Sequence, residues 1–299
     1  MSRLRFLVSL ITSDNDYQVE QAQSAEQAAR SLNVDLQVMY AGNDAITQST
    51  QILKAVQSPQ AIRPHAIVFE PAGGTALSQA ARAAASAGVA WAILNREATY
   101  VAELRKTSAA PVFSLSSNQY EVGRIQGRQC AALLPHGGSI LYIQGPTENF
   151  AAKERAAGMQ QARPPNIHVT TLKGQWTEDS AQKSVRSWLK LMTSQRAAVD
   201  LIAAQNDSMA MGARKAFQEL PEADRERWLA LPYLGCDGLP KTGQAWVRSG
   251  LLTATIFIPP NAGRAITMLV DALVHKKHLQ ESAVTAAESI PSLEELQRR

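Results

Sequence analysis

The stretch Ala204-Gln205-Asn206-Asp207-Ser208-Met209-Ala210-Met211-Gly212-Ala213 decides the fold, because it places polar side chains where a buried parallel strand passes into a helix. Residues 201–204 predict the strand, and residues 209–220 predict the helix. In open α/β sheets, ligands bind beyond the carboxyl ends of the strands. We therefore expect Asn206 to face a ligand crevice and Asp207 to cap the exposed amides of the helix.

Short apolar runs alternate with longer amphipathic segments along the whole chain, which is typical of repeated β-α units and parallel sheets. The first cycle predicts strands at 5–12, 35–41, 66–70 and 91–95, with a first helix at 17–32. The second cycle predicts strands at 111–117, 139–144, 168–172, 201–205 and 232–236, and helices at 121–134, 151–163 and 178–192. A strand at 252–258 follows, and a helix at 261–275 is expected to return to the first lobe. The repetition predicts two Rossmann-like α/β lobes.

The stretch 204–213 also resembles the signature of the type I periplasmic binding proteins. These are the ribose and galactose receptors, whose fold is shared by the effector-binding core of LacI-type repressors. Further matching blocks are Leu94-Asn95-Arg96, the helical segment 152–159, Gly235-Cys236-Asp237-Gly238 and the segment 252–256. These blocks occur in the family's order and at its spacing over nearly all 299 residues. The resemblance implies two lobes joined by a three-strand hinge, with a ligand cleft between them.

The expected lobes are discontinuous in sequence, comprising residues 1–117 plus 259–285 and residues 118–258 plus 286–299. The polar stretch Ser116-Ser117-Asn118-Gln119 predicts the first crossing, and Pro259-Pro260 breaks regular structure at the second. A third crossing near 282–287 is implied by the resemblance alone.

Composition limits the other classes of function. The formal charge of +4 comes from Lys and Arg scattered along the chain, which indicates a solvated surface and no nucleic-acid groove. The two cysteines, Cys130 and Cys236, have no metal-ligand spacing with each other or with the five histidines, so we expect two buried free thiols, no metal site and no cofactor.

The first eleven residues imitate a secretory signal, with a basic start and an apolar run. They also match the family's first core strand and lack a small-residue cleavage site. We expect a periplasmic location if a separate signal peptide was removed, and a cytoplasmic location as the alternative. No run of the sequence approaches the length needed to cross a membrane.

Asn15 and Tyr17 follow the first predicted strand, in a loop from which the family supplies an amide and an aromatic ring to a sugar. Sugars present C–H faces and hydroxyl edges, which suit a flat ring and a two-sided amide respectively. We expect Tyr17 and Asn15 to fill these roles. The alternative is that Asn15 or Asp14 caps the first helix, which would leave the other available for contact.

Asn95 and Arg96 end the fourth predicted strand, where the sugar-binding relatives usually carry Asp-Arg. A guanidinium holds ligand oxygens in a planar fork, so Arg96 is expected to be a ligand donor. Asn95 can donate as well as accept, whereas aspartate only accepts, and the hydroxyl pattern recognised here is expected to differ. A salt bridge between Arg96 and Glu97 is the structural alternative.

Arg155 aligns with the family's ligand arginine and has Lys153 beside it. A helical arginine is by itself typical of a solvated surface, but the resemblance implies that Arg155 contacts the ligand while Lys153 stays in solvent. Trp176 matches a position that is aromatic in the ribose receptor, where an indole would stack on a sugar ring. Core packing is the alternative role for Trp176.

Asn206 and Asp237 complete the expected ligand set, each directly after a strand. Asp237 could instead form a tight turn, since Asp-Gly is a common turn pair. The chain departs from the family pattern at Cys236, where an aromatic residue is expected, and at Ile258, where a polar amide is expected. Fewer polar anchors favour a deoxy-sugar, a small polyol or a partly apolar ligand over ribose.

The resemblance implies a solute-binding protein that closes on a small polyhydroxylated ligand, preferably a sugar, and delivers it to the permease of an ABC importer. The alternative is an effector sensor of the same fold, acting with a membrane sensor kinase or a regulator. A DNA-binding domain is disfavoured, since no helix-turn-helix precedes residue 5. An enzyme is disfavoured too, because we find no pair of nucleophile and base, although Glu70, Asp14 and Asp16 could imitate a glycosidase pair.

Overall fold

The computed structural model describes residues 3–72, 77–96, 98–191 and 198–298. They form two compact units. Unit 1 comprises Met1–Ser117 and Pro260–Thr285, and unit 2 comprises Asn118–Pro259 and Ala286–Arg299. The chain passes between the units at three points, which follow Ser117, Pro259 and Thr285. Each unit has its own sheet and its own layers of helices.

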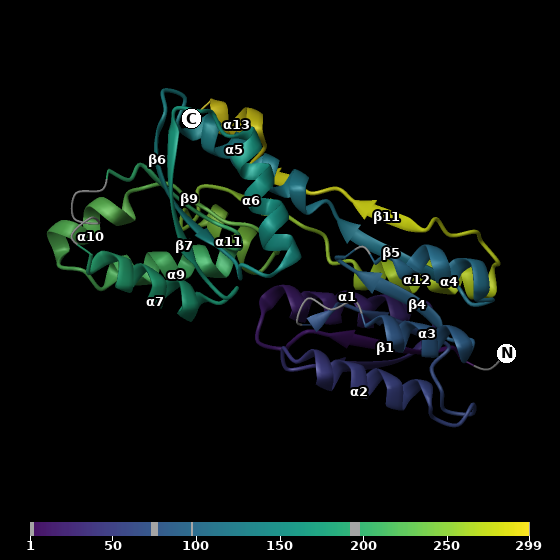
Figure 1. Ribbon diagram of the computed structural model, residues 1–299. Helices are drawn as coiled ribbons and strands as arrows, with labels where there is room; N and C mark the ends of the chain where they lie inside the picture. The colour runs from purple at the N-terminus through teal and green to yellow at the C-terminus, as the bar shows by residue number, and fades with distance from the viewer. Residues whose placement is uncertain (1–2, 73–76, 97, 192–197, 299) are drawn as a thin grey trace. The chain divides into compact units, whose positions relative to one another are not determined.

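Unit 1 is built on a six-stranded sheet in which every neighbouring pair is parallel. The strands, in spatial order, are β11 (Ser282–Thr285), β5 (Val112–Ser117), β4 (Ala90–Leu94), β3 (Ala66–Phe69), β1 (Arg5–Leu10) and β2 (Asp35–Tyr40). The central strands are fully buried because helices cover both faces of the sheet. In Figure 1 the yellow strand β11 lies beside β5, although they are far apart in sequence.

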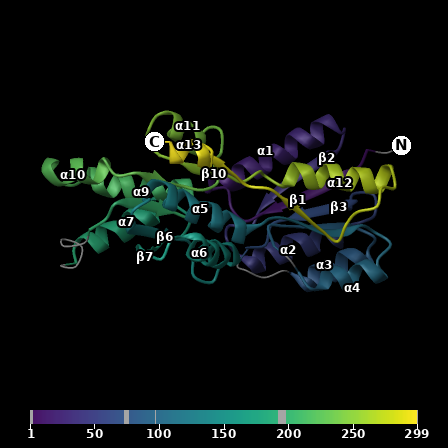
Figure 2. The same cartoon turned by 90° about the horizontal axis from the view of Figure 1, so that it is seen from above.

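Helices cover both faces of the unit 1 sheet, as Figure 2 shows. One face carries α1 (Asp16–Ser31) and α12 (Ala262–Val274), and the other carries α2 (Ala45–Val56), α3 (Ser78–Ser86) and α4 (Tyr100–Thr107). Alanines three or four residues apart on α1, namely Ala22, Ala25 and Ala29, are buried against the first face. Small side chains let the backbone of α1 approach the sheet and α12 closely.

Unit 2 has a four-stranded parallel sheet with a small antiparallel sheet beside it. The main sheet, in spatial order, contains β7 (Ile167–Lys173), β6 (Gly138–Gln144), β8 (Leu201–Ala204) and β9 (Tyr233–Leu234). The small sheet pairs β10 (Thr255–Phe257) with β12 (Glu288–Ile290). These parallel sheets confirm the predicted α/β class.

The helices of unit 2 also form two layers (Figure 1). One layer contains α5 (Gln119–Leu133), α6 (Phe150–Ala162) and α13 (Leu293–Gln297), and the other contains α7 (Glu178–Leu189), α9 (Asp207–Gln218), α10 (Glu222–Leu229) and α11 (Gly243–Arg248). The core between the unit 2 sheet and this second layer of helices includes a stacked pair of rings, Phe217 and Trp228, whose centroids lie 4.5 Å apart. No helix within the described ranges is long and apolar enough to cross a membrane.

Two strand predictions were wrong in detail. The predicted strand 111–117 opens no second cycle, because β5 pairs with β4 and belongs to the first sheet. The predicted strand 252–258 shortens to β10, Thr255–Phe257, since the chain before it makes only an isolated bridge from Ala254 to Leu234. Apolar content alone does not distinguish a paired strand from an extended connection.

Helices α5 and α6 pack with their backbones nearly touching, and two glycines make this possible. A Cβ on Gly158 would lie 2.0 Å from the carbonyl oxygen of Tyr120, and a Cβ on Gly123 would lie 2.1 Å from that of Arg155. Neither carbonyl is the flexible end of a side chain, so the helices would have to separate. Because the Arg155 carbonyl itself contacts Gly123, this close packing also fixes the position of the Arg155 backbone relative to α5.

We predict that Gly158→Ala lowers the free energy of unfolding by about 1–3 kcal/mol, the range for overpacking a closely packed contact. Urea unfolding followed by circular dichroism measures the change. The matched control is Ala157→Ser, which adds one heavy atom at the exposed neighbouring position and should change stability by about 0.5 kcal/mol or less. Equal effects of the two variants would contradict the packing argument.

Candidate ligand-binding site

The turn from β8 into α9 corrects the prediction made for Asn206 and Asp207. Asn206 caps the helix, because its Oδ1 accepts a hydrogen bond from the Met209 N–H at 2.9 Å. Asp207 is already the first residue of the helix, so its side chain points inward and not back at the free amides. The cap is therefore one residue earlier than we expected.

The rest of the Asn206 amide holds a neighbouring loop. Its Nδ2 donates to the carbonyl oxygen of Trp176 at 2.9 Å, and the residue is only 2% exposed. Asn206 thus fixes the backbone that carries the Trp176 ring. Its predicted contact with a ligand stays a prediction.

Arg155 lies inside unit 2, contrary to the usual place of a helical arginine. Its side chain is 8% exposed and forms an ion pair with Asp237, with Nη1 and Oδ1 3.5 Å apart. Its Nε donates to Oε1 of Gln119 at 2.8 Å, and its Nη1 donates to the carbonyl oxygen of Gln205. Lys153, on the same helix, is exposed beside Glu148, as expected.

Trp176 packs beside this guanidinium. The Arg155 Cζ lies 5.6 Å from the centroid of the indole, which is within the range of a cation–π interaction. Trp176 has a left-handed backbone with φ +65°, and its ring lies so close to Gly145 that a Cβ there would be 2.5 Å from the ring. The ring is half-buried, so core packing and a remaining exposed surface coexist.

Asp237 has the turn role that was the alternative to ligand contact, and its contact with a ligand stays a prediction. It has φ +99° and Gly238 has φ +57°, so the pair does form a tight left-handed turn. The same turn directs the Asp237 carboxylate to Arg155. The structure therefore brings Arg155, Trp176 and Asp237 together, with Asn206 behind them.

Sequence reasoning missed the glutamines that hold this cluster. Gln205 is fully buried: its Nε2 donates to the Tyr142 hydroxyl and to the Ala152 carbonyl, and its Oε1 accepts from the Gly145 N–H, all at 2.9 Å. Gln119, the second of the two, begins α5. Both lie in stretches that we had singled out, Gln205 beside Asn206 and Gln119 in the first predicted crossing.

In unit 1, Asn95 follows β4 with a left-handed backbone, φ +54°. Its Oδ1 accepts a hydrogen bond from Nδ2 of Asn261 at 2.9 Å. Asn261, which no sequence argument identified, is completely buried just before α12. Asn95 itself is partly exposed.

Arg96 is also partly exposed. Within residues 3–72, 77–96, 98–191 and 198–298, no side chain forms a hydrogen bond or ion pair with its guanidinium. Glu97, the alternative partner considered for Arg96, lies outside the described residues. The role of Arg96 as a ligand donor stays a prediction.

Asn15 caps α1, the alternative role that we considered for it. Its Oδ1 accepts from the Tyr17 N–H at 3.0 Å and the Gln18 N–H at 3.3 Å. Tyr17 is half-buried in the first turn of the helix. Asn15 and Tyr17 thus stand together after β1, while Asn95 and Arg96 form a second pair after β4.

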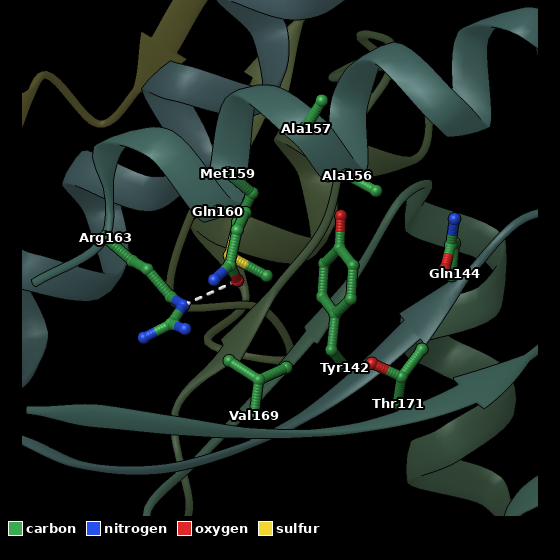
Figure 3. A pocket seen from close by; sticks show the side chains of 9 residues that line it. All are labelled: Tyr142, Gln144, Ala156, Ala157, Met159, Gln160, Arg163, Val169 and Thr171. Atoms are coloured by element: carbon green, nitrogen blue, oxygen red, sulfur yellow. Dashed lines mark hydrogen bonds between the residues drawn. The ribbon is translucent and has the colours of Figure 1, made fainter. Parts of the chain in front are cut away.

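Two cavities, one in each unit, are lined by none of the predicted ligand residues. The larger, about 430 Å³, lies in unit 2 between α6 and strands β6 and β7 (Figure 3). Arg163, its charged residue, donates to Gln160 and to the carbonyls of Pro164 and Ile167. The cavity of unit 1, about 350 Å³, lies between α4, β5 and β11. The polar groups predicted to bind the ligand lie elsewhere.

Asp207 is a second carboxylate near this cluster, and its surroundings disfavour its charge. Complete burial and the neighbouring Asp237 raise the pKa of Asp207 well above its ordinary value. Hydrogen bonds from the Gly238 N–H at 2.8 Å and the Thr255 hydroxyl at 2.6 Å act in the opposite direction. Burial also raises the pKa of the Cys236 thiol to about 12, so this free cysteine stays protonated.

We predict that Asp207→Asn becomes progressively more favourable to stability as the pH rises from about 4 to 7. An unfolded aspartate ionises near pKa 3.9, before the folded Asp207 does, so the wild type loses stability above that pH and the amide variant does not. Urea unfolding at several pH values measures the difference. Asp179→Asn, at an exposed carboxylate in the same unit, is the control, and a difference that shrinks with rising pH would contradict the prediction.

Comparisons with known proteins agree with this architecture. The chain is 26% identical to the ribose import binding protein of Salmonella typhimurium over 281 residues, which is 94% of this chain and 88% of that protein. It is 27% identical to the xylitol-binding protein of Mycolicibacterium smegmatis over 263 residues, 86% of this chain and 68% of the relative.

A solved structure similar to this chain is an ABC transporter periplasmic solute-binding protein from Actinobacillus succinogenes with bound D-allose. The TM-score is 0.82 at 20% identity, covering 99% of this chain and 100% of the other. The model of the periplasmic binding protein domain family matches residues 6–278. The chain therefore belongs to the periplasmic binding protein domain family, as the sequence motifs predicted.

Proposed function

We propose that this protein binds a small sugar or polyol reversibly and presents it to the membrane permease of an ABC importer. The observation that carries the proposal is the cluster of buried Arg155 with partly exposed Asp237 and Trp176 at the carboxyl ends of the unit 2 strands. A charged donor, a charged acceptor and an aromatic face are what a polyhydroxylated ring requires. The similarity to ribose import and xylitol-binding proteins supports this ligand class.

We further propose that side chains of both units contact one ligand. Asn95 and Arg96, with Asn15 and Tyr17, would act from unit 1, and Arg155, Trp176 and Asp237 from unit 2. Contacts made by both units together exist in only one arrangement of the chain, so the ligand would favour that arrangement by its difference in affinity. This shift in population would be the signal that a permease reads.

Transport is favoured over sensing by the relatives, because several of them are named as import binding proteins. A periplasmic location follows from the same proposal, since an importer collects its ligand outside the inner membrane. Binding without chemistry suffices for this role. In the described cluster around Arg155, we identify no nucleophile activated by a neighbouring base.

A thermal-shift screen with monosaccharides, polyols and nucleosides tests the ligand class. A ligand that binds only the native state stabilises it, by about 2.7 kcal/mol at a concentration 100 times its Kd. We expect a sugar or polyol to raise the melting temperature. A response to nucleosides alone, or to none of these classes, would reject the proposal.

We predict that Arg96→Ala and Asp237→Asn each weaken binding of the ligand so found by tenfold to hundredfold, roughly the effect of losing a hydrogen bond to a charged group. Isothermal calorimetry measures the affinity. The matched controls are Arg82→Ala in unit 1 and Asp179→Asn in unit 2, both at exposed ion pairs. Weakening by only one of the two site variants would show that one unit alone holds the ligand.

A further inference from the structure

Four polar side chains of unit 1, those of Asn95, Ser117, Asn261 and Thr285, form a connected network. Besides its bond to Asn95, Asn261 accepts a hydrogen bond from the Thr285 hydroxyl at 3.1 Å, and its Nδ2 also lies 3.5 Å from the Ser117 hydroxyl. The hydroxyls of Ser117 and Thr285 are 2.9 Å apart and share a hydrogen bond. Ser117, Asn261 and Thr285 are all buried, and only Asn95 is partly exposed.

The network determines which way the Asn261 amide points. With Oδ1 on the Thr285 side, both amide hydrogens of Asn261 have acceptors, namely Oδ1 of Asn95 and the hydroxyl of Ser117. The reversed amide would meet only the Thr285 hydroxyl with its two hydrogens, leaving one of them without an acceptor among these four residues. A buried donor without a partner costs free energy, so the first orientation is favoured.

The orientation of Asn261 in turn fixes that of Asn95. Because Asn261 presents an N–H to Asn95, Asn95 must answer with its carbonyl oxygen. Its Nδ2 is then turned away from the network, and among the described residues no hydrogen bond reaches it. The left-handed backbone of Asn95, which asparagine tolerates better than most residues, keeps the amide in this place.

We propose that Asn261 makes Asn95 a hydrogen-bond donor to the ligand, and that the site consequently selects a polyhydroxylated ligand with an oxygen that accepts but cannot donate. This inference rests on the proposed function and specifies its ligand. Arg96, the next residue, is also a donor and never an acceptor. An aspartate at position 95 would accept only and would require a donor on the ligand. The amide held by Asn261 only donates towards the ligand, so a hydroxyl that accepts from it and from Arg96 finds no acceptor in these two side chains for its own proton.

The shared chemistry, an acceptor oxygen without a proton, occurs in carboxylates, in carbonyl groups and in the ring oxygen of a cyclic sugar. The probes are therefore three compounds of one carbon skeleton: the alditol, the aldonate and the aldonolactone, in a pentose and a hexose series. The alditol offers only hydroxyls, the aldonate adds a carboxylate and the lactone adds an uncharged carbonyl. The quantity measured by calorimetry is the ratio of each acceptor compound's affinity to that of its alditol.

For the wild type we expect the aldonate or the lactone to bind at least tenfold more tightly than the alditol. Asn95→Asp retains an oxygen for the Asn261 N–H but has no donor, so this ratio should fall at least tenfold. Asn261→Asp should lower the ratio in the same direction without touching the ligand, because its carboxylate accepts from Asn95 and forces that amide to reverse. A merely structural role for Asn261 would weaken all probes equally and leave the ratio unchanged.

Asn33→Asp is the matched control, since Asn33 is exposed, has the same φ of +54° and lies at the opposite edge of the unit 1 sheet. Its ratio should equal that of the wild type. Should the buried charge of Asn261→Asp prevent folding, as circular dichroism would reveal, Asn95→Asp decides alone.

A wild type that prefers the alditol, or an Asn95→Asp variant with an unchanged ratio, overturns the inference while leaving the proposed function intact. If none of the three compounds in either series binds, but an acyclic polyol that has only hydroxyls does, the acceptor rule is wrong and the ligand class stands. If no sugar or polyol binds at all, the proposed function fails first. An aldonate preference identifies the acceptor as a carboxylate, and a lactone preference identifies it as an uncharged carbonyl or ring oxygen.

Discussion

The candidate site in unit 2 depends on keeping one guanidinium charge away from water. Removing a charge from water costs several kcal/mol unless partners of opposite charge and hydrogen-bond acceptors replace the lost solvation. Arg155 obtains these partners from three separate elements: Asp237 after β9, Gln205 after β8 and Gln119 at the start of α5. Because each partner is fixed by its own backbone, the charge is held in one place before any ligand arrives.

In unit 1, buried amide side chains hold the loops at the ends of the strands in place. Gln48, on α2, donates to the carbonyl of Glu70 at 2.8 Å and accepts from the Ala72 N–H at 2.8 Å, so it ties down the turn after β3. Gln21, on α1, links the Glu70 carboxylate to the first turn of α12 through the Ala262 N–H. An amide can donate and accept without bringing a charge into the interior, which suits it to holding loops at the ends of strands.

The order of strands and helices could be predicted because each element has its own local pattern of apolar residues. Buried central strands such as β3 and β8 are continuous apolar runs, and α1 shows its alanine stripe at helical spacing. The small sheet of β10 and β12 could not be predicted, because a three-residue strand has no periodicity of its own and depends on a partner about thirty residues away in sequence. Pairing between distant segments is a tertiary property.

The candidate site likewise has features that the local sequence predicts and features that depend on tertiary packing. The residue type after a strand indicated Asp237, and the family resemblance indicated Arg155. Their ion pair and the burial of Arg155 depend on the close approach of α5 and α6, which two glycines allow. The capping roles of Asn15 and Asn206 depend on which residue starts each helix, and a shift of one residue exchanges cap and interior. Asn261 was invisible in the sequence, since nothing near it suggests that it contacts Asn95, 166 positions earlier.

The contrast between Asn95 and Asp237 shows how the fold separates stability from recognition. Both have left-handed backbones at the end of a strand, so the turn requires a residue that tolerates positive φ, and Asn and Asp serve almost equally. The choice between them therefore carries little weight for the backbone and is available for chemistry. Asp237 supplies the charge that balances Arg155. Asn95 faces the amide of Asn261, and an aspartate in its place would put a charge beside a network that contains none. Exchanging a carboxylate oxygen for an amide nitrogen at such a position can alter which ligand oxygens the side chain binds, without altering the fold that positions the side chain.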